Sequence, residues 1–422
     1  MRNLPKLSRI QVPYGNTEQS YTCANELEFD LVLPNNSLPI NDPKIYIQNQ
    51  LQSPLDKMNL DGCLAGKKVG ICVNDTTRPV PNPVLLPPLL EFLTQKGIAK
   101  KDISFFIAYG THQQKIGDEK QIFPPSILSS YPIHHHNCDD KNNLIYLGET
   151  SRKTPIIINK EYHSQDIKIV VGNIEPHHFM GYSGGVKSAA IGLGGRETIR
   201  INHSHLIEAG SFIGNYETNP TRMDLEEIGD RIGISSALNV VLNSEKQIVK
   251  VLWGTPHSVM EMGIPVSKKV CQKKVDKLYD LVIASPGGFP KDINLYQAQK
   301  AITHVSQITK EQGIILLVAE CREGLGSVEF EKYLGKFASL EDVSRHFSNE
   351  KFEIGPHKAY LLARQASRNR IIIVSSIPST ILQKTHLEFA SSLSEAMDLI
   401  FASLPPKPAL AVVPYATNTM FY

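Results

Sequence analysis

Short runs of apolar residues, rich in valine and isoleucine, recur along the chain and are bounded by glycine, proline, asparagine or serine. Continuous apolar runs of about four to eight residues are typical of strands that are buried on both faces of a parallel sheet. The pattern predicts strands at Lys68–Val73, Ile103–Tyr109, Ile167–Val171, Asp280–Ala284, Gly313–Val318, Ile371–Val374 and Ala409–Val413.

Stretches with helical character lie between these runs. Residues Pro83–Lys96 carry leucine, valine and phenylalanine at spacings that suit a helix packed on a sheet. A second stretch, Leu393–Leu404, has Ser392 or Ser394 as its candidate N-cap. Alternating strands and helices predict an α/β fold of two domains with mostly parallel sheets.

The strand signals fall into two groups, which set the expected domain boundaries. A chain of 422 residues is long enough for two or three domains of about 150 residues. We expect an N-terminal α/β domain over residues 1–265 and a C-terminal α/β domain over residues 270–405. A stiff, proline-rich linker precedes the last strand, and it leaves open whether residues 406–422 return to the N-terminal domain.

Charge and composition narrow the class of protein. The 44 basic and 42 acidic residues nearly cancel, and no segment is basic enough for a surface that binds nucleic acid. No apolar run reaches the roughly 20 residues of a membrane helix, and the N-terminus lacks the apolar stretch of a secretory signal. The six cysteines include no CxxC pair, which favours reduced thiols. The sequence therefore predicts a cytoplasmic protein without nucleic-acid or membrane partners.

Polar and unusual segments follow four of the predicted strands. In an open α/β sheet, ligands bind beyond the carboxyl ends of the strands, where loops carry the reactive groups. The four segments are residues 74–79 (NDTTRP), 109–112 (YGTH), 172–188 (GNIEPHHFMGYSGGVKS) and 285–300 (SPGGFPKDINLYQAQK). Because they bring histidine, arginine, lysine, aspartate and tyrosine to strand ends, we expect an enzyme.

The glycine-rich stretch before Lys187 resembles a phosphate-binding loop only in part. Such a loop needs glycine directly before the lysine, and this chain has Val186 there. A weaker hypothesis is that the backbone N–H groups of Ser183, Gly184 and Gly185 bind a phosphate in front of a helix of small residues. The alternative is a turn whose glycines serve close packing alone.

Several histidines are candidates for chemistry. His112 and His177 follow different strands and could converge on one cleft, where imidazole suits proton transfer near neutral pH. His203 lies in an expected helix. The run at residues 134–136 (HHH) is interpreted as structural, with incidental metal affinity at most. The same structural interpretation applies to His178, His205, His257, His304 and His357.

Taken together, five motifs resemble the nickel-dependent lactate racemase family. They are residues 75–81 (DTTRPVP), 110–112 (GTH), 175–188 (EPHHFMGYSGGVKS), 202–203 (NH) and 287–300 (GGFPKDINLYQAQK). They occur in order, with matching internal spacing, over essentially the whole chain. The resemblance implies a racemase or epimerase of a 2-hydroxy acid, with its active site in the cleft between a cofactor-binding, catalytic N-terminal domain and a C-terminal domain that closes over the substrate.

The resemblance also implies a cofactor and roles for particular residues. The cofactor is a nickel-pincer nucleotide, a pyridinium bis-thiocarboxylate mononucleotide that accepts and returns a hydride. By motif, Lys187 carries it covalently, His203 completes the nickel coordination, and His112 and His177 form the acid/base pair. Cofactor-biosynthesis enzymes are the implied partners that load it. The other matching positions are Asp75, Thr77, Ser183, Gly184 and Gly185 for the cofactor and Arg78, Tyr296, Gln297 and Lys300 for the substrate.

Some positions depart from the family pattern. Gln113 follows His112 where arginine is common, Val186 precedes Lys187 where arginine is frequent, and residues 178–180 (HFM) replace a more aromatic run. Residues 355–358 (GPHK) stand where the lactate enzyme has an aromatic residue. Because pocket shape and charge set the choice of substrate, the candidates are lactate, a related 2-hydroxycarboxylate or, by epimerisation, a larger sugar acid.

Two other functions remain as alternatives. A nicotinamide-dependent 2-hydroxyacid dehydrogenase would share hydride transfer, but the chain has no GxGxxG motif opening a first βαβ unit. A non-catalytic carrier of nickel or of the cofactor would keep Lys187 and His203, yet it would have no use for both His112 and His177. An isomerase is therefore the favoured interpretation.

Overall fold

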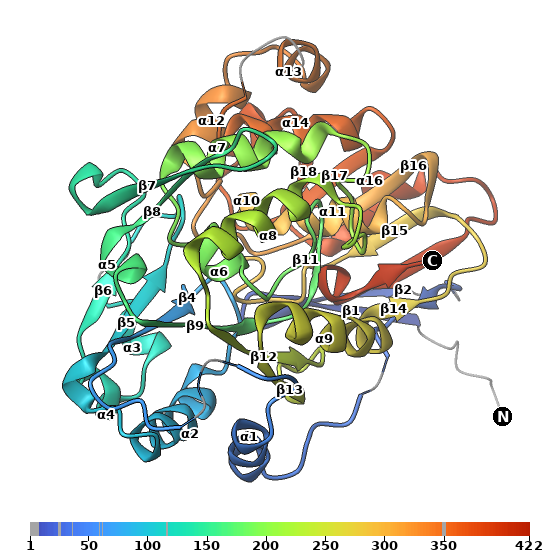
Figure 1. The fold of residues 1–422 in the computed structure, drawn as a ribbon. Helices are drawn as coiled ribbons and strands as arrows, with labels where there is room; N and C mark the ends of the chain where they lie inside the picture. The colour runs from blue at the N-terminus through green and yellow to red at the C-terminus, as the bar shows by residue number, and fades with distance from the viewer. Residues whose placement is uncertain are drawn as a thin grey trace, which may run out of the picture. The chain divides into compact units, whose positions relative to one another are not determined.

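The computed structural model (Figure 1) describes residues 8–23, 27–35, 37–58, 60, 62–114, 117–347 and 352–422. The chain forms two compact units, one of Asn36–Val270 and one that combines Met1–Asn35 with Cys271–Tyr422. Each contains a six-stranded sheet with helices around it. The predicted α/β fold of two domains with mostly parallel sheets is confirmed.

The sheet of the Asn36–Val270 unit has the strand order β13-β12-β9-β4-β5-β6. All neighbours are parallel except β12 and β13, which are antiparallel. Every residue of β9 and β12 is buried, as befits central strands. The strands are β4 (Val69–Asn74), β5 (Ile103–Ala108), β6 (Ile133–His135), β9 (Ile167–Asn173), β12 (Ser236–Leu242) and β13 (Ile248–Gly254).

Helices and small hairpins surround this sheet. Helix α2 (Asn82–Gln95) buries Leu85, Leu89 and Leu93 in the core that Val69 and Ile71 of the sheet also form. The other helices are α1 (Pro43–Gln52), α3 (Glu119–Ile122), α4 (Pro125–Leu128), α5 (Lys160–His163), α6 (Lys187–Ala190), α7 (Arg196–Ser204), α8 (Pro220–Ile232) and α9 (Pro256–Cys271). The hairpins are β7 (Leu144–Glu149) with β8 (Pro155–Asn159), and β10 (Pro176–His177) with β11 (Gly181–Tyr182).

The sheet of the other unit has the order β18-β17-β16-β15-β19-β3, and all its neighbours are parallel. Its strands are β3 (Asp30–Leu31), β15 (Tyr279–Ala284), β16 (Thr309–Val318), β17 (Arg370–Val374), β18 (Glu388–Ala390) and β19 (Leu410–Val413). Two further pairs are β1 (Ser8–Tyr14) with β2 (Thr17–Cys23) and β14 (Gln272–Lys273) with β20 (Met420–Phe421).

Apolar cores lie on both faces of that second sheet. Ile10 of β1 and Met397 of α16 pack with Leu281 and Ile283 on one face, while Phe330 and other helix residues share a core with the opposite face. The helices are α10 (Leu295–Ala298), α11 (Lys300–Val305), α12 (Val328–Leu334), α13 (Leu340–Phe347), α14 (Pro356–Ala366), α15 (Ser379–Leu382) and α16 (Leu393–Phe401). Ser392 caps α16, because its hydroxyl accepts a bond from Glu395 N–H at 3.2 Å.

All the strands predicted from continuous apolar runs are present, and the two compact units divide the chain differently from the expected domains of residues 1–265 and 270–405. The strand β19 pairs with β15 and β3, so residues 406–422 do not return to the first unit. The chain up to Asn35 also belongs to the second unit rather than to a domain of residues 1–265. Hydrogen-bonded partners that are distant in the chain decide both points, and local sequence does not reveal them.

Further strands escaped prediction because polar residues interrupt their apolar runs. Asn239 stands in the middle of β12 and Lys250 in β13, while β1 alternates buried Ile10 and Val12 with polar residues. Within the described residues, no helix combines the length and the apolar content that crossing a bilayer requires.

Candidate active site

A tight turn follows strand β4 and fixes the first group of candidate residues. Arg78 N–H donates to the Asp75 carbonyl at 3.2 Å, which closes the turn. The Thr77 hydroxyl donates to Asp75 Oδ1 at 2.7 Å, and the Arg78 guanidinium donates to the same hydroxyl at 2.9 Å. The Asp75 carboxylate is buried and is held in place at the carboxyl end of the sheet.

His112 lies beyond the neighbouring strand β5 and pairs with that carboxylate. Its Nδ1 is 2.7 Å from Asp75 Oδ2. Burial acts to raise the pKa of Asp75, but the His112 ring and the Arg78 charge lower it by more, so the pKa lies below its usual value. An ionised carboxylate only accepts hydrogen bonds, so the neutral form of the His112 ring carries its proton on Nδ1 and has its lone pair on Nε2. The arrangement orients a base.

His177 lies in the β10–β11 hairpin, directly opposite Gly181. The Met180 backbone N–H donates to His177 Nδ1 at 3.2 Å. Because a backbone amide is only a donor, the neutral His177 ring must carry its proton on Nε2. The two histidines are therefore held in opposite tautomers, one with an accepting Nε2 and one with a donating Nε2.

The glycine-rich loop before Lys187 is held by hydrogen bonds of its own. Ser183 N–H donates to the Glu175 carbonyl, and Gly185 N–H donates to Asn239 Oδ1, both at 2.8 Å. The N–H groups of Ser183 and Gly185 thus have partners within the protein, and a role of Ser183, Gly184 and Gly185 in binding the cofactor stays a prediction. Moreover, α6 is only a four-residue helix.

Close packing explains why glycines stand at these positions. Gly184 has φ +88° and Gly185 has φ +58°, and a Cβ at Gly185 would meet Met260 Cγ at 2.8 Å and Arg222 Nη2 at 2.9 Å. L-residues with side chains adopt such φ values at a cost and have no room here. The packing alternative raised by the sequence therefore accounts for this turn.

Arg222 is a structural anchor that the sequence did not reveal. It is fully buried, and its guanidinium donates to the carbonyls of Tyr182 at 3.0 Å and Gly184 at 3.1 Å and to Glu226 at 2.6 Å. An Arg–Glu pair four residues apart on a helix looks like an ordinary surface pair in sequence. Because the loop lies 38 to 40 residues earlier in the chain, the sequence does not show that Arg222 contacts it.

Lys187 begins helix α6 and is half-buried. Burial, followed by the positive charges of Arg78 and Arg222, lowers the pKa of Lys187 to about 7, although Glu175 and Asp75 act in the opposite direction. A substantial share of this side chain is therefore a neutral amine near neutral pH. A desolvated lysine beside other cations is a suitable nucleophile for covalent attachment.

His203 lies in the last turn of α7, as the sequence predicted. Its ring meets the Phe179 ring edge-on at 5.2 Å, and Phe179 meets His177 in the same way at 4.8 Å. The preceding residue, Asn202, anchors the helix through a 2.8 Å bond to Asp224, a buried carboxylate. One aromatic ring thus contacts both the predicted nickel ligand and one of the predicted catalytic histidines.

These contacts bring the predicted residues of this unit together. Asp75 contacts His112, and its charge also acts on the pKa of Lys187. The β10–β11 hairpin links His177 to the loop before Lys187, and Phe179 links His177 to His203. Since β4, β5 and β9 are parallel, the segments that follow them lie at one edge of the sheet.

The histidine run at residues 134–136 is structural, as interpreted. His134 pairs with Glu161 at 2.7 Å, His135 Nδ1 contacts the Tyr109 hydroxyl at 3.2 Å, and His136 Nε2 bonds the Gly194 carbonyl at 2.9 Å. Each ring serves a separate partner. No group of three or more metal-ligating side chains was found in the described part of the chain.

The predicted substrate residues of the other unit form their own cluster. Asn294 caps α10 by accepting from Gln297 N–H at 3.0 Å, and Lys300 Nζ donates to Gln297 Oε1. The Tyr296 ring lies edge-on to Phe330 at 6.0 Å. A role of Tyr296, Gln297 and Lys300 in substrate binding stays a prediction.

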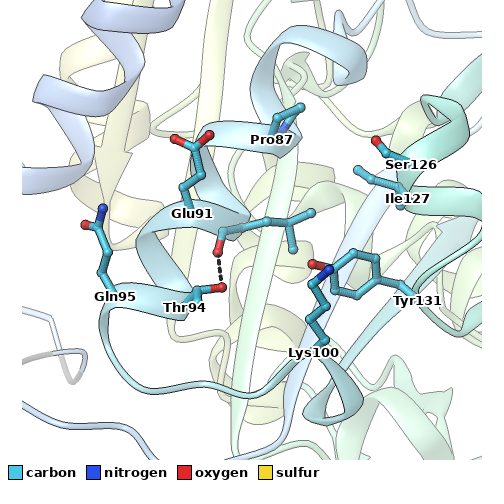
Figure 2. A pocket seen from close by; sticks show the side chains of 9 residues that line it. Pro87, Glu91, Thr94, Gln95, Lys100, Ser126, Ile127 and Tyr131 are labelled. Atoms are coloured by element: carbon cyan, nitrogen blue, oxygen red, sulfur yellow. Dashed lines mark hydrogen bonds between the residues drawn. The ribbon is translucent and has the colours of Figure 1, made fainter.

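Two cavities of about 390 Å³ lie in the Asn36–Val270 unit. Figure 2 shows the first, whose lining includes Leu90 of α2, Ile127 of α4 and Tyr131, and which involves none of the candidate residues. The second touches the candidate site only through Val186, the neighbour of Lys187. Side-chain chemistry rather than cavity size therefore identifies the candidate site.

Comparisons with known proteins show the family of the chain. Residues 14–214 match the Lactate racemase N-terminal domain and residues 274–419 match the Lactate racemase C-terminal domain. The chain is 26% identical to the lactate racemase of Thermoanaerobacterium thermosaccharolyticum over 97% of this chain and 98% of the relative. It is 28% identical to the lactate racemase of Lactiplantibacillus plantarum over 87% of this chain and 88% of the relative.

Solved structures show the same fold. The lactate racemase apoprotein from Thermoanaerobacterium thermosaccharolyticum superposes with a TM-score of 0.89 at 25% identity, covering 98% of this chain and 100% of that one. A Thermotoga maritima protein shares the fold with a TM-score of 0.71 at 17% identity, covering 93% of this chain and 100% of that one. The chain therefore belongs to the lactate racemase family and is a racemase, an enzyme of the isomerase class.

Proposed function

We propose that this protein interconverts the enantiomers of a 2-hydroxy acid, lactate or a related 2-hydroxycarboxylate, with His112 and His177 as its acid/base pair. The observation that carries the proposal is that the two histidine rings are held in opposite tautomers. Asp75 leaves an accepting Nε2 on His112, and the Met180 N–H leaves a donating Nε2 on His177. Inversion of a carbinol carbon needs one group that removes the hydroxyl proton and another that returns a proton.

The residues present also fit the nickel-pincer nucleotide that the family resemblance implies. Lys187 offers an amine with a pKa of about 7, suited to covalent attachment, and the His203 imidazole is a nitrogen donor that nickel accepts. When bound, this group supplies a ring that takes a hydride from the substrate and returns it. Lys187 and His203 would hold it, and its loading would depend on cofactor-biosynthesis enzymes.

The chain's own residues then divide the remaining tasks. Arg78 offers a fork of N–H donors that can hold the substrate carboxylate in two bonds. The Thr77 hydroxyl accepts a bond from the Arg78 guanidinium at 2.9 Å and so fixes the position of Arg78. His112 accepts the hydroxyl proton at Nε2, and Asp75 stabilises the positive charge that results. His177, once it has itself taken up a proton, returns a proton from the other ring to the substrate oxygen, which restores the hydroxyl group. Tyr296, Gln297 and Lys300 are proposed to bind the substrate as well.

The test is racemisation by protein produced together with the cofactor-biosynthesis enzymes. Nickel content and intact mass first establish loading, and chiral chromatography then follows a panel of 2-hydroxy acids. We expect His112→Ala and His177→Ala each to lower kcat by about 10²–10⁴-fold while leaving nickel content unchanged. Unchanged rates in both variants would refute the acid/base assignment, and loaded wild-type protein without any turnover would favour the carrier alternative.

A further inference from the structure

The last turn of α7, which carries His203, is held by contacts from outside the helix. The last carbonyl groups of a helix have no partners within it, so its end frays most easily. Asn202 is fully buried, and its Nδ2 donates to the Thr221 carbonyl at 3.0 Å and to Asp224 Oδ2 at 2.8 Å. Both partners belong to α8, so this helix fixes the backbone next to His203.

Asp224 is a buried acceptor to which a third segment also binds. Thr150 and Thr154, in the turn between β7 and β8, donate from their hydroxyls to its carboxylate at 2.5 and 2.9 Å. An ionised carboxylate has only acceptor sites and takes all three donors, whereas an amide would turn an NH₂ group towards one of them. The carboxylate of Asp224 therefore joins α7, α8 and this turn in one arrangement.

The N-cap of α8 supports the ring that packs against His203. Asn219 is buried, and its Oδ1 accepts the Arg222 N–H at 3.0 Å, which caps the helix. Its Nδ2 donates to the Phe179 carbonyl at 2.8 Å. The Phe179 ring in turn lies edge-on to His203, with 5.2 Å between the ring centroids. One asparagine thus caps α8 and holds the residue that contacts the His203 imidazole.

We propose that Asp224 and Asn219 are positioning residues for His203 as the nickel ligand. This inference rests on the proposed function, because it takes His203 as that ligand. Asp224 fixes the helical turn that carries the imidazole, and Asn219 fixes the ring against which the imidazole lies. A metal-binding imidazole needs one fixed orientation, and loss of the groups that orient such a ligand typically costs about 10–100-fold in metal affinity.

Two substitutions of equal size test these contacts. Asp224→Asn keeps the shape of the side chain but replaces one acceptor oxygen with a donor that faces other donors. Asn219→Asp keeps the N-cap, because aspartate and asparagine cap helices about equally well, but it loses the donor to the Phe179 carbonyl. We expect a chelator to remove nickel from each loaded variant about ten- to hundred-fold faster than from wild type. Asn219→Asp carries the test if Asp224→Asn does not fold.

The matched control is Thr198→Val, which removes buried hydrogen bonds from the first part of α7. Thr198 is fully buried, and its hydroxyl donates to the Pro155 carbonyl at 2.6 Å and accepts the Ile157 N–H at 2.9 Å. We expect this variant to lower the midpoint of thermal unfolding and to release nickel at the wild-type rate. In unloaded protein, amide hydrogen exchange in the last turn of α7 should be faster in Asp224→Asn than in wild type, which gives a readout without nickel.

The outcomes separate this inference from the proposed function. Wild-type rates of nickel release in Asp224→Asn and Asn219→Asp would overturn the inference and leave the function intact. Release that is accelerated equally in Thr198→Val would show a general loss of stability and would also overturn the inference. Wild-type protein that retains no nickel when it is produced with the cofactor-biosynthesis enzymes would overturn both.

Discussion

At the scale of single residues, the site depends on how each hydrogen-bonding partner fixes a protonation state. His112 and His177 are the same side chain, yet a carboxylate faces Nδ1 of one and a backbone N–H faces Nδ1 of the other. The sequence identified both histidines but not this difference, because the partners are brought to the rings by separate strands and turns. A racemase needs two proton-transfer groups, one that removes a proton and one that returns a proton.

Asp75→Asn tests the orientation of His112. The asparagine keeps the size of the side chain but loses the charge that holds Nδ1–H and stabilises a protonated ring. We expect kcat in loaded enzyme to fall by about a hundred-fold or more, with unchanged nickel content. The control is Glu161→Gln, which removes the carboxylate from the His134 pair at 2.7 Å outside the site. Equal activity of Asp75→Asn and wild type would show that this contact orients nothing.

The amine of Lys187 provides a test that needs no cofactor. Its pKa is lowered to about 7, whereas a solvated lysine titrates near about 10.4. The reactive neutral form is therefore expected to appear as the pH rises through about 7. Competitive acetylation of unloaded protein, read by peptide mass spectrometry, should give a labelling profile for Lys187 with its midpoint there. A midpoint near that of a free lysine would contradict the assignment.

At the scale of elements, the three segments that carry the candidate residues follow the carboxyl ends of β4, β5 and β9. Close packing in the loop before Lys187 holds the segment that follows β9 in place. The sequence placed these strands correctly because their apolar runs are continuous. It missed β12, whose central Asn239 is the residue that holds Gly185. Asn239, the polar residue that hid β12 from prediction, is thus the residue that holds the loop before Lys187 in place.

Gly185→Ala tests that packing. The substitution forces a side chain into φ +58° and against Met260 and Arg222, and we expect a loss of about 2–4 kcal/mol in the free energy of unfolding. Gly233→Ala is the matched control, since Gly233 has φ +74° with nothing within 4 Å of an added Cβ. Urea unfolding should show only about 1 kcal/mol for the control. An equal loss of unfolding free energy in the two variants would mean that the close contacts around Gly185 do not destabilise Gly185→Ala.

At the scale of the whole molecule, the two units are not simply successive pieces of chain. The N-terminal segment supplies β3 to the edge of the sheet formed by Cys271–Tyr422, and β1 contributes Ile10 and Val12 to its core. The Asn36–Val270 unit is continuous in the chain. The second unit is therefore built from two segments that are distant in the chain.

Fragments test this organisation. We expect residues 36–270 to unfold cooperatively when produced alone, because that unit is built from one continuous segment. Residues 271–422 alone should bind a hydrophobic dye and exchange amide protons quickly, since the sheet face covered by β1 is exposed. Joining residues 1–35 to that fragment through a flexible linker should restore protection. A fragment of 271–422 that is already cooperative would contradict the role given to the N-terminal segment.

The amino-acid sequence by itself determined the α/β class, the buried strands, and the identity and order of the motifs that carry His112, His177, Lys187 and His203. These depend on local periodicity and on the short-range spacing of residues, which a linear pattern records. Only the tertiary structure decided which unit the chain ends join, that Arg222 and Asn239 hold the loop, and which nitrogen of each histidine bears the proton. Those features depend on partners that folding brings from distant segments, and only the three-dimensional arrangement of the chain determines the distances between them.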